Sequence, residues 1–151
     1  MFRNRLVLIL ALAFGAASST ACSFGEIYLT DPFLREVSLE DQQQHYSSLI
    51  RWSAFAKAAV YVEPEQREEF MRVAPPLKDF RFTDYESGPV QLDDKGECTV
   101  EVVYYGYRTD WPLEVEVHET QHWKRNGFTN EWRVSSVFQG LDKAIGRSAK
   151  R

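Results

Sequence analysis

The chain has 151 residues, of which 44% are hydrophobic and 14% aromatic, so it can build one domain with a sizeable core and is too short for two. Its formal net charge of −4 lacks the basic excess of a nucleic-acid-binding protein, so we expect no nucleic-acid partner. The same balance gives no polybasic attraction to anionic lipid.

Residues 1–21 have the anatomy of a secretory signal. Arg3 and Arg5 form a positive start, residues 6–17 form an apolar run, and small residues at 16–21 lead to Cys22. The apolar run is shorter than the about 20 residues that a membrane-spanning helix needs. We therefore predict a cleaved signal peptide, with an uncleaved anchor as the alternative.

Residues 19–22, Ser-Thr-Ala-Cys, resemble the lipobox of bacterial lipoproteins, in which the cysteine is lipidated and becomes the mature N-terminus. Ser19 departs from the aliphatic residue usual at that position, and the same small residues suit ordinary signal-peptidase cleavage. The resemblance implies a lipid anchor on Cys22 that faces the periplasm, and Ser23 implies the outer rather than the inner membrane. Without lipidation the protein would be secreted into the periplasm, where Cys22 and Cys98 could form a disulfide.

Helical spacing dominates the next part of the chain. Residues 22–37 are expected to form the lipidated N-terminus and a tether, and Ser38 to cap a helix from Leu39 to Tyr61. Trp52 and Phe55 are expected in the core rather than in a ligand pocket. A second, short helix is predicted from Pro64 to Val73, with its acidic residues on a solvated face.

From residue 79 onward the apolar pattern has a period of two, which indicates strands. Alternation covers residues 79–83, 97–107, 113–118 and 128–138, and turn-forming residues separate these runs at 88–89, 93–96, 109–112 and 126–127. The polar tail, residues 139–151, is expected to be frayed or loosely helical. The domain predicted over residues 38–138 is therefore α+β, with N-terminal helices packed on a curved antiparallel sheet.

This order of elements resembles the nuclear transport factor 2-like (cystatin-like cone) fold. The stretch from Pro64 to Tyr85 and the later Glu-Thr-Gln-His-Trp at residues 119–123 also look like a group of small proteobacterial lipoproteins with that fold. The resemblance implies a location and an architecture, and no activity.

Residues 118–122, His-Glu-Thr-Gln-His, match the zinc-protease pattern H-E-x-x-H. The pattern works on a helix, where both histidines bind one metal and the glutamate activates its water. The alternation that runs into the motif favours a strand, which would separate His118 and His122 by about 13 Å at about 3.3 Å per residue. Asp142 is the sole acidic residue near the usual spacing of a third ligand. A zinc hydrolase through His118, Glu119 and His122 is thus a remote alternative, and no metal or other cofactor is expected.

An Asn-Gly turn at residues 126–127 would fix the register of the last hairpin. It would pair Gln121 with Trp132, Glu119 with Val134 and Val115 with Phe138 on one face. On the other face it would pair His122 with Glu131 and Thr120 with Arg133.

A strand would turn Glu119 and Gln121 toward the inside of the cone. Tyr104, Trp132 and Asp84 are candidate neighbours there, and together they could line a pocket. No second acid–base partner is identifiable by spacing, and no phosphate loop, Cys-x-x-Cys or G-x-S-x-G pattern occurs.

We therefore expect a cell-envelope lipoprotein whose domain is a non-enzymatic binding or accessory module. An envelope protein, a small apolar ligand and a second copy of the chain remain candidate partners. The alternative is a small-molecule enzyme or ligand-binding pocket inside the cone that uses Glu119.

Overall fold

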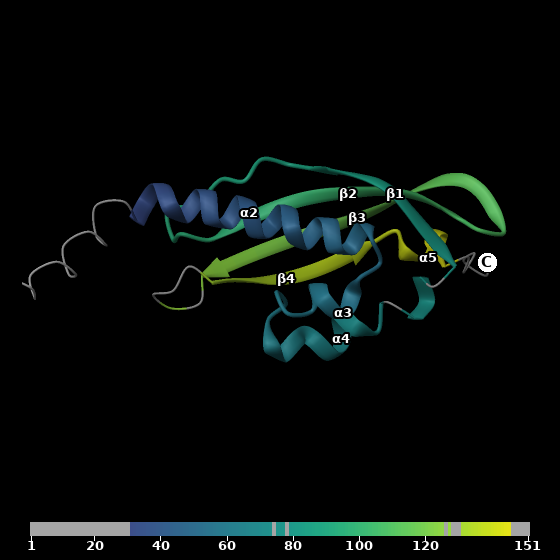
Figure 1. The fold of residues 1–151 in the computed structure, drawn as a ribbon, viewed down its shortest axis with the longest axis horizontal. Helices are drawn as coiled ribbons and strands as arrows, with labels where there is room; N and C mark the ends of the chain where they lie inside the picture. Colours follow the sequence, from purple (N-terminus) through teal and green to yellow (C-terminus); the bar gives the residue numbers. More distant parts are fainter. Residues whose placement is uncertain (1–30, 74, 78, 126, 128–130, 146–151) are drawn as a thin grey trace, which may run out of the picture. The chain divides into compact units, whose positions relative to one another are not determined.

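The computed structural model describes residues 31–73, 75–77, 79–125, 127 and 131–145. The chain divides into two compact units, Met1–Leu34 and Arg35–Arg151, and nearly all described residues belong to the second. In that unit helices precede a four-stranded antiparallel sheet with the strand order β1-β2-β3-β4 (Figure 1). The predicted α+β arrangement is confirmed.

The long helix α2 runs over Asp31–Arg51, and the short helix α3 runs over Phe55–Ala58. The prediction of one helix from Leu39 to Tyr61, capped by Ser38, was wrong at both ends. Residues 31–37, assigned to the tether, are already helical. The helix is interrupted after Arg51, where Ser53 has a φ of 56° in the left-handed region. After this interruption a separate helix, α3, begins. Apolar residues on either side of the interruption therefore do not lie on one continuous helix face.

Trp52 shows the consequence of the break. Its side chain is 69% exposed, with the Arg51 guanidinium 4.7 Å from the ring centroid, so its predicted place in the core was wrong. Phe55, three residues later, is buried as predicted.

The second predicted helix is confirmed as a 3-10 turn, η1 (Pro64–Gln66), followed by α4 (Arg67–Met71). A further 3-10 turn, η2, covers Pro75–Leu77. Before η1 the chain runs parallel to the outer edge of β4, where the Glu63 amide donates to the Val134 carbonyl (3.0 Å) and the Val134 amide to the Tyr61 carbonyl (2.9 Å). This segment therefore fixes α4 beside β4.

The strands are β1 (Phe80–Ser87), β2 (Cys98–Arg108), β3 (Trp111–Arg125) and β4 (Trp132–Gln139). Each of the four predicted runs overlaps a strand, but β1 and β3 extend well beyond theirs, and Trp111 and Pro112, expected in a turn, lie within β3. The turn at residues 93–96 is confirmed, because the Asp93 carboxylate accepts the amides of Lys95 and Glu97, both at 2.8 Å. After β4, α5 (Leu141–Ala144) is the helical part of the predicted tail.

The predicted register of the last hairpin was wrong. Trp132 pairs with Arg125 rather than Gln121, and Glu119 pairs with Phe138 rather than Val134. The reason is that β3 ends at Arg125 and β4 begins at Trp132, so the connection is longer than a two-residue Asn-Gly turn. Because the displacement along the strand is an even number of residues, each side chain keeps its predicted face.

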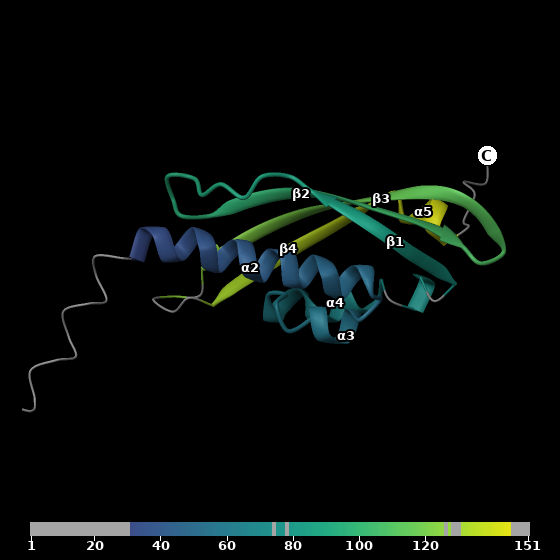
Figure 2. The same ribbon diagram turned by 45° about the horizontal axis from the view of Figure 1, so that its top comes forward.

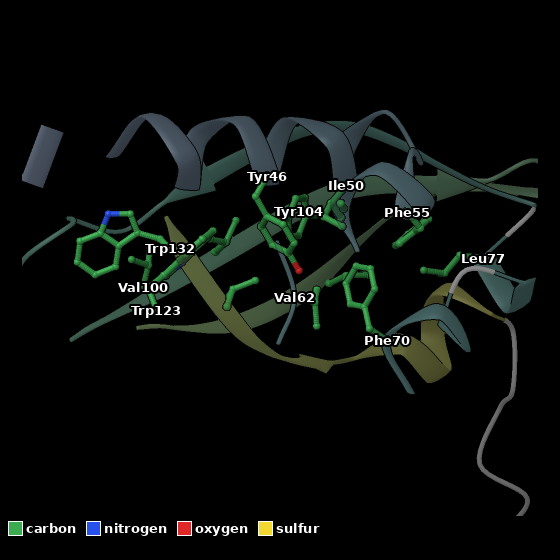
Figure 3. Close-up of a cluster of buried hydrophobic side chains, with 14 of the residues drawn as sticks. Tyr46, Ile50, Phe55, Val62, Phe70, Leu77, Val100, Tyr104, Trp123 and Trp132 are labelled. Atoms are coloured by element: carbon green, nitrogen blue, oxygen red, sulfur yellow. The ribbon is translucent and has the colours of Figure 1, made fainter. Parts of the chain in front are cut away.

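Helix α2 lies along one face of the sheet, with α3 and α4 near β4 (Figures 1 and 2). Between them lies the core, which is rich in large aromatic side chains (Figure 3). Tyr46 meets Trp123 edge-on, with ring centroids 5.6 Å apart at 89°, and Trp123 and Trp132 are both fully buried. This packed layer surrounds the polar residues of the candidate site.

Candidate functional site

Alternation along β3 places two polar residues on its buried face. Val115, Val117, Glu119, Gln121 and Trp123 are buried in turn, and the residues between them are exposed or half-buried. Their neighbours on the sheet are Tyr104, which pairs with Val117, and Ser136, which pairs with Gln121. The predicted inward direction of Glu119 and Gln121 is therefore confirmed, and both are fully buried.

The Glu119 carboxylate receives two hydrogen-bond donors on each oxygen. The Tyr46 hydroxyl donates to Oε1 at 2.7 Å, and the Ser136 hydroxyl donates to the same atom. The Tyr104 hydroxyl donates to Oε2 at 2.8 Å, and the Gln121 amide donates to it at 2.7 Å. Four donors fill the acceptor sites of a carboxylate. We refer to Glu119 and these four partners as the Glu119 network.

A second set of polar groups surrounds the network. The Gln121 amide also donates to the Ser47 hydroxyl (3.1 Å), and the Gln121 carbonyl accepts the Trp123 indole N–H (3.1 Å). From α2, the Gln43 amide donates to the Gln121 carbonyl at 3.2 Å and to the Ser87 hydroxyl at 2.8 Å. These bonds join α2 to strands β1 and β3 through the interior.

Burial favours the neutral, protonated form of the Glu119 carboxyl group. Removal from water raises the pKa of Glu119 above its ordinary value of 4.5, although the hydrogen bonds from Ser136, Gln121, Tyr46 and Tyr104 lower it in part. Burial, and next to it the negative charge of Glu119, raises the pKa of Tyr46 and Tyr104 well above 10.0. Both phenols therefore keep their protons and act as donors.

The raised pKa predicts a pH dependence of stability. Between pH 4.5 and the higher folded-state pKa, the folded protein holds a proton on Glu119 that the unfolded chain has lost, so stability falls as the pH rises across this interval. Chemical unfolding of the wild type and of Glu119→Gln between pH 4 and 8 is the measurement. The wild type should lose up to about 1.4 kcal/mol per pH unit relative to the variant. Parallel curves for the two proteins would show that Glu119 has the same pKa in both states.

Two predicted neighbours of Glu119 have different outcomes. Tyr104 contacts it directly, as predicted. Asp84 is exposed on β1, so its predicted place beside Glu119 was wrong; the pairing with β2 shifts between Phe82 and Asp84. Trp132 is fully buried, but its indole N–H has no hydrogen-bond partner among the described residues.

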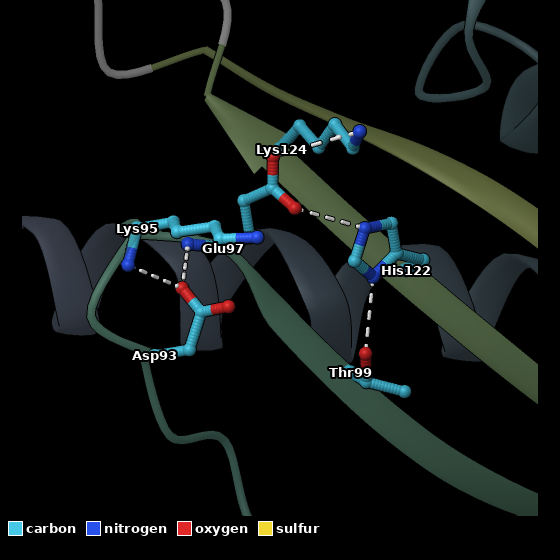
Figure 4. Close-up of polar contacts among 6 residues, drawn as sticks. All are labelled: Asp93, Lys95, Glu97, Thr99, His122 and Lys124. Atoms are coloured by element: carbon cyan, nitrogen blue, oxygen red, sulfur yellow. Dashed lines mark hydrogen bonds and ion pairs between the residues drawn. The ribbon is translucent and has the colours of Figure 1, made fainter.

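The histidines of the zinc-protease pattern lie on the outer face of β3. His122 contacts Glu97 through Nε2 (3.1 Å) and Thr99 through Nδ1 (3.0 Å), and Lys124 also contacts Glu97, at 3.5 Å (Figure 4). His118 lies 3.5 Å from Glu116. Because the motif is on a strand, the stacked helical geometry of a zinc protease is absent, and Glu119 points to the opposite face. No group of three metal-ligating side chains occurs within the described ranges.

The predicted partners of the outer face were also wrong. His122 faces Ser135 on β4 instead of Glu131, and Thr120 faces Val137 instead of Arg133. The cause is the same displaced register. Thr120 instead donates to Glu101 across the β2–β3 pair at 3.0 Å.

A hollow of about 400 Å³ opens between α4, β4 and α5, away from the Glu119 carboxylate. Most of its lining is apolar, and Gln66, Glu69 and Ser136 are the polar members. None of the residues predicted to line a pocket (Glu119, Gln121, Tyr104 and Trp132) belongs to it. Ser136 is the link, since it lines the hollow and donates to Glu119.

Sequence reasoning missed Ser136 and the polar residues of α2. Gln43, Tyr46, Ser47 and Ile50 recur at helical spacing and are all buried, so two polar side chains interrupt the apolar stripe of a helix. Polar residues at these positions could have predicted that the helix contributes to a buried polar network. Glu69 is exposed, as predicted for the acidic residues of this helix, and it also lines the hollow, which the sequence did not predict.

The predicted lipidation site and signal, Cys22 and residues 1–21, lie outside the described residues. Cys98 is buried with a free thiol, and burial raises the pKa of that thiol, which makes it a poor nucleophile. Among the described helices, none has the length and apolar character to cross a membrane.

No protein-family model, curated protein or solved structure matches the chain. The inference of function therefore rests on the chain's own residues.

Proposed function

We propose that the chain is a cell-envelope lipoprotein whose folded part is a non-enzymatic module that binds a small, largely apolar molecule. The hollow between α4 and β4 is the observation that carries this proposal. Its volume of about 400 Å³ falls in the range of about 300–1,000 Å³ typical of ligand pockets, and Val62, Phe70 and Phe138 give it apolar walls.

The Glu119 network supports a structural rather than a catalytic role for its carboxylate. Both oxygens already have two donors, and the side chain has no exposed surface. A general base must reach the proton that it removes, directly or through one water. Glu119 meets the hollow only through the Ser136 hydroxyl.

The folded part is proposed to be a cystatin-like cone, and Cys22 is proposed to carry a lipid anchor. A helix laid on an antiparallel sheet in the order β1-β2-β3-β4 agrees with the cystatin-like cone that the sequence resembles. The signal-like residues 1–21 and Cys22 support export and lipidation. The outer membrane is the proposed location, with Cys22 as the anchor.

Two measurements test the proposal. The intact mass of the protein extracted from membranes should include a diacylglycerol adduct on Cys22; a mature chain that starts at another residue contradicts the anchor.

An NMR titration with indole, a neutral aromatic probe, should shift resonances of the lining residues. Val73→Phe, which fills the hollow, should weaken binding at least fivefold, and Met71→Phe, two residues earlier at the end of α4 and outside the lining, should not. Indole shifts that avoid the lining would refute the pocket.

A second candidate function is an acid–base or acyl-transfer enzyme, and the Ser136–Glu119 contact favours it. A serine that lines a hollow and donates to a buried carboxylate has the arrangement of a nucleophile beside a base. Incubation with a fluorophosphonate and measurement of the intact mass separate the two candidates. A covalent adduct on Ser136 that Glu119→Gln removes supports the enzyme; an unmodified chain supports the binding module.

A further inference from the structure

We propose that the ligand of this hollow is a protonated amine attached to an apolar body. This inference rests on the proposed binding function and names the chemical class of the ligand. It follows from the polar atoms that line the hollow and from the charges around it.

The three polar side chains of the lining all offer hydrogen-bond acceptors. Glu69 is a carboxylate, which only accepts, and Gln66 offers an amide oxygen. The Ser136 hydroxyl gives its proton to Glu119, so its oxygen faces a ligand as an acceptor. The Gln66 amide also carries N–H donors, but the charged group of the lining, Glu69, only accepts, and an ammonium group offers it up to three donors.

Glu69, an exposed carboxylate, also supplies a negative charge beside the hollow. Arg72 is paired with Glu68 at 2.6 Å, and Arg67 donates to the carbonyls of Val62 (3.0 Å) and Val60 (3.3 Å). Within the part of the chain that the structure describes, the Glu69 carboxylate forms no hydrogen bond or ion pair. A cationic ligand would therefore provide the missing counter-charge.

The walls fit the rest of such a molecule. Phe70 and Phe138 line the hollow with their ring centroids 6.2 Å apart at 38°, and aromatic faces attract organic cations. A second hollow of about 250 Å³ adjoins the first, because both include Glu69, Val73 and Leu141. Glu69 thus borders both hollows, and because Arg72 lines the second one, the first hollow is the one that takes the apolar body while the carboxylate binds the ammonium group.

An NMR titration with four probes of similar size tests the inference: benzylamine, benzyltrimethylammonium, benzyl alcohol and phenylacetate at pH 7. Benzylamine should bind at least tenfold more tightly than benzyl alcohol, since a hydrogen bond to a charged group is the stronger kind. Phenylacetate should bind more weakly than either. Benzyltrimethylammonium should bind less tightly than benzylamine, because it is cationic but has no N–H.

Glu69→Gln should remove most of the advantage of benzylamine over benzyl alcohol. Glu65→Gln is the matched control, because Glu65 is an exposed carboxylate four residues earlier that lies outside the lining, and its variant should bind like the wild type. Equal affinity for benzylamine and benzyl alcohol, both lost in Val73→Phe, would overturn the amine inference and leave the proposed pocket intact. Absence of shifts at the lining residues with every probe would overturn both. Equal affinity for the two cations would overturn the need for N–H donors.

Discussion

Replacement of Glu119 by alanine is expected to lower the free energy of unfolding by about 3–5 kcal/mol. The change removes the acceptor of four donors, of which Tyr46 and Tyr104 lie in the core without access to water. It also leaves a cavity where the carboxylate was packed against α2. An unsatisfied buried donor costs about 1–3 kcal/mol, and the hydroxyls can rotate to recover part of this loss. Urea unfolding of the purified domain measures the effect.

Glu116→Ala is the matched control for this variant. Glu116 lies on the same strand, three residues earlier, with its side chain on the exposed face. Its contact with His118 is 3.5 Å long and open to solvent, so the loss should stay within about 0.5 kcal/mol. A Glu119→Ala variant as stable as Glu116→Ala would mean that water enters the core and replaces the carboxylate.

The faces of the strands could be predicted from the sequence, and the alignment between β3 and β4 could not. Period-two alternation fixes which residues of β3 point inward, so Glu119 and Gln121 were placed correctly. The register depends on where the hairpin turns, and an Asn-Gly pair does not by itself set the length of the loop. The predicted register was displaced from the observed one by an even number of residues, so each side chain was still assigned to the correct face of the sheet.

The break between α2 and α3 had no signal in the hydrophobic pattern. Apolar residues continue through Trp52 and Phe55 at helical spacing, which favoured one long helix. Ser53 instead adopts a positive φ, a conformation that non-glycine residues rarely take without tertiary support. This is why Trp52 was misplaced and Phe55 was not.

The candidate site needed information from distant parts of the chain. Glu119 was identified as a polar residue on a buried face, and Tyr104 as its neighbour, from strand parity alone. Tyr46 and Ser136 lie 73 and 17 residues away from Glu119 in sequence, and their contact depends on the docking of α2 and on the true register of β4. The hollow depends in addition on the placement of α4 by the Val62–Val134 bridge.

Replacement of Gly106 by alanine is expected to lower the free energy of unfolding by about 3 kcal/mol, because the β1–β2 pair has no room for a methyl group. An added Cβ would lie 2.5 Å from the Arg81 carbonyl oxygen and 2.5 Å from the nearest ring carbon of Phe80. Phe80 is buried and contacts the Phe82 ring edge-on at 4.9 Å, so its ring cannot turn aside freely. The main-chain oxygen of Arg81 can move only with the whole strand. Thermal or urea unfolding measures the loss.

Gly96→Ala is the control that separates the steric clash at Gly106 from the loss of stability that any glycine replacement causes. Gly96 has a φ of 75° and open space around it, so its variant should lose only about 1 kcal/mol from backbone strain. Phe80→Leu should recover part of the loss in Gly106→Ala, because the smaller side chain removes the ring contact and leaves only the Arg81 oxygen. β1 is an edge strand that pairs with β2 alone, so it has freedom to shift outward. A loss below 1 kcal/mol in Gly106→Ala would show that β1 uses this freedom and that Phe80 is not fixed in the core.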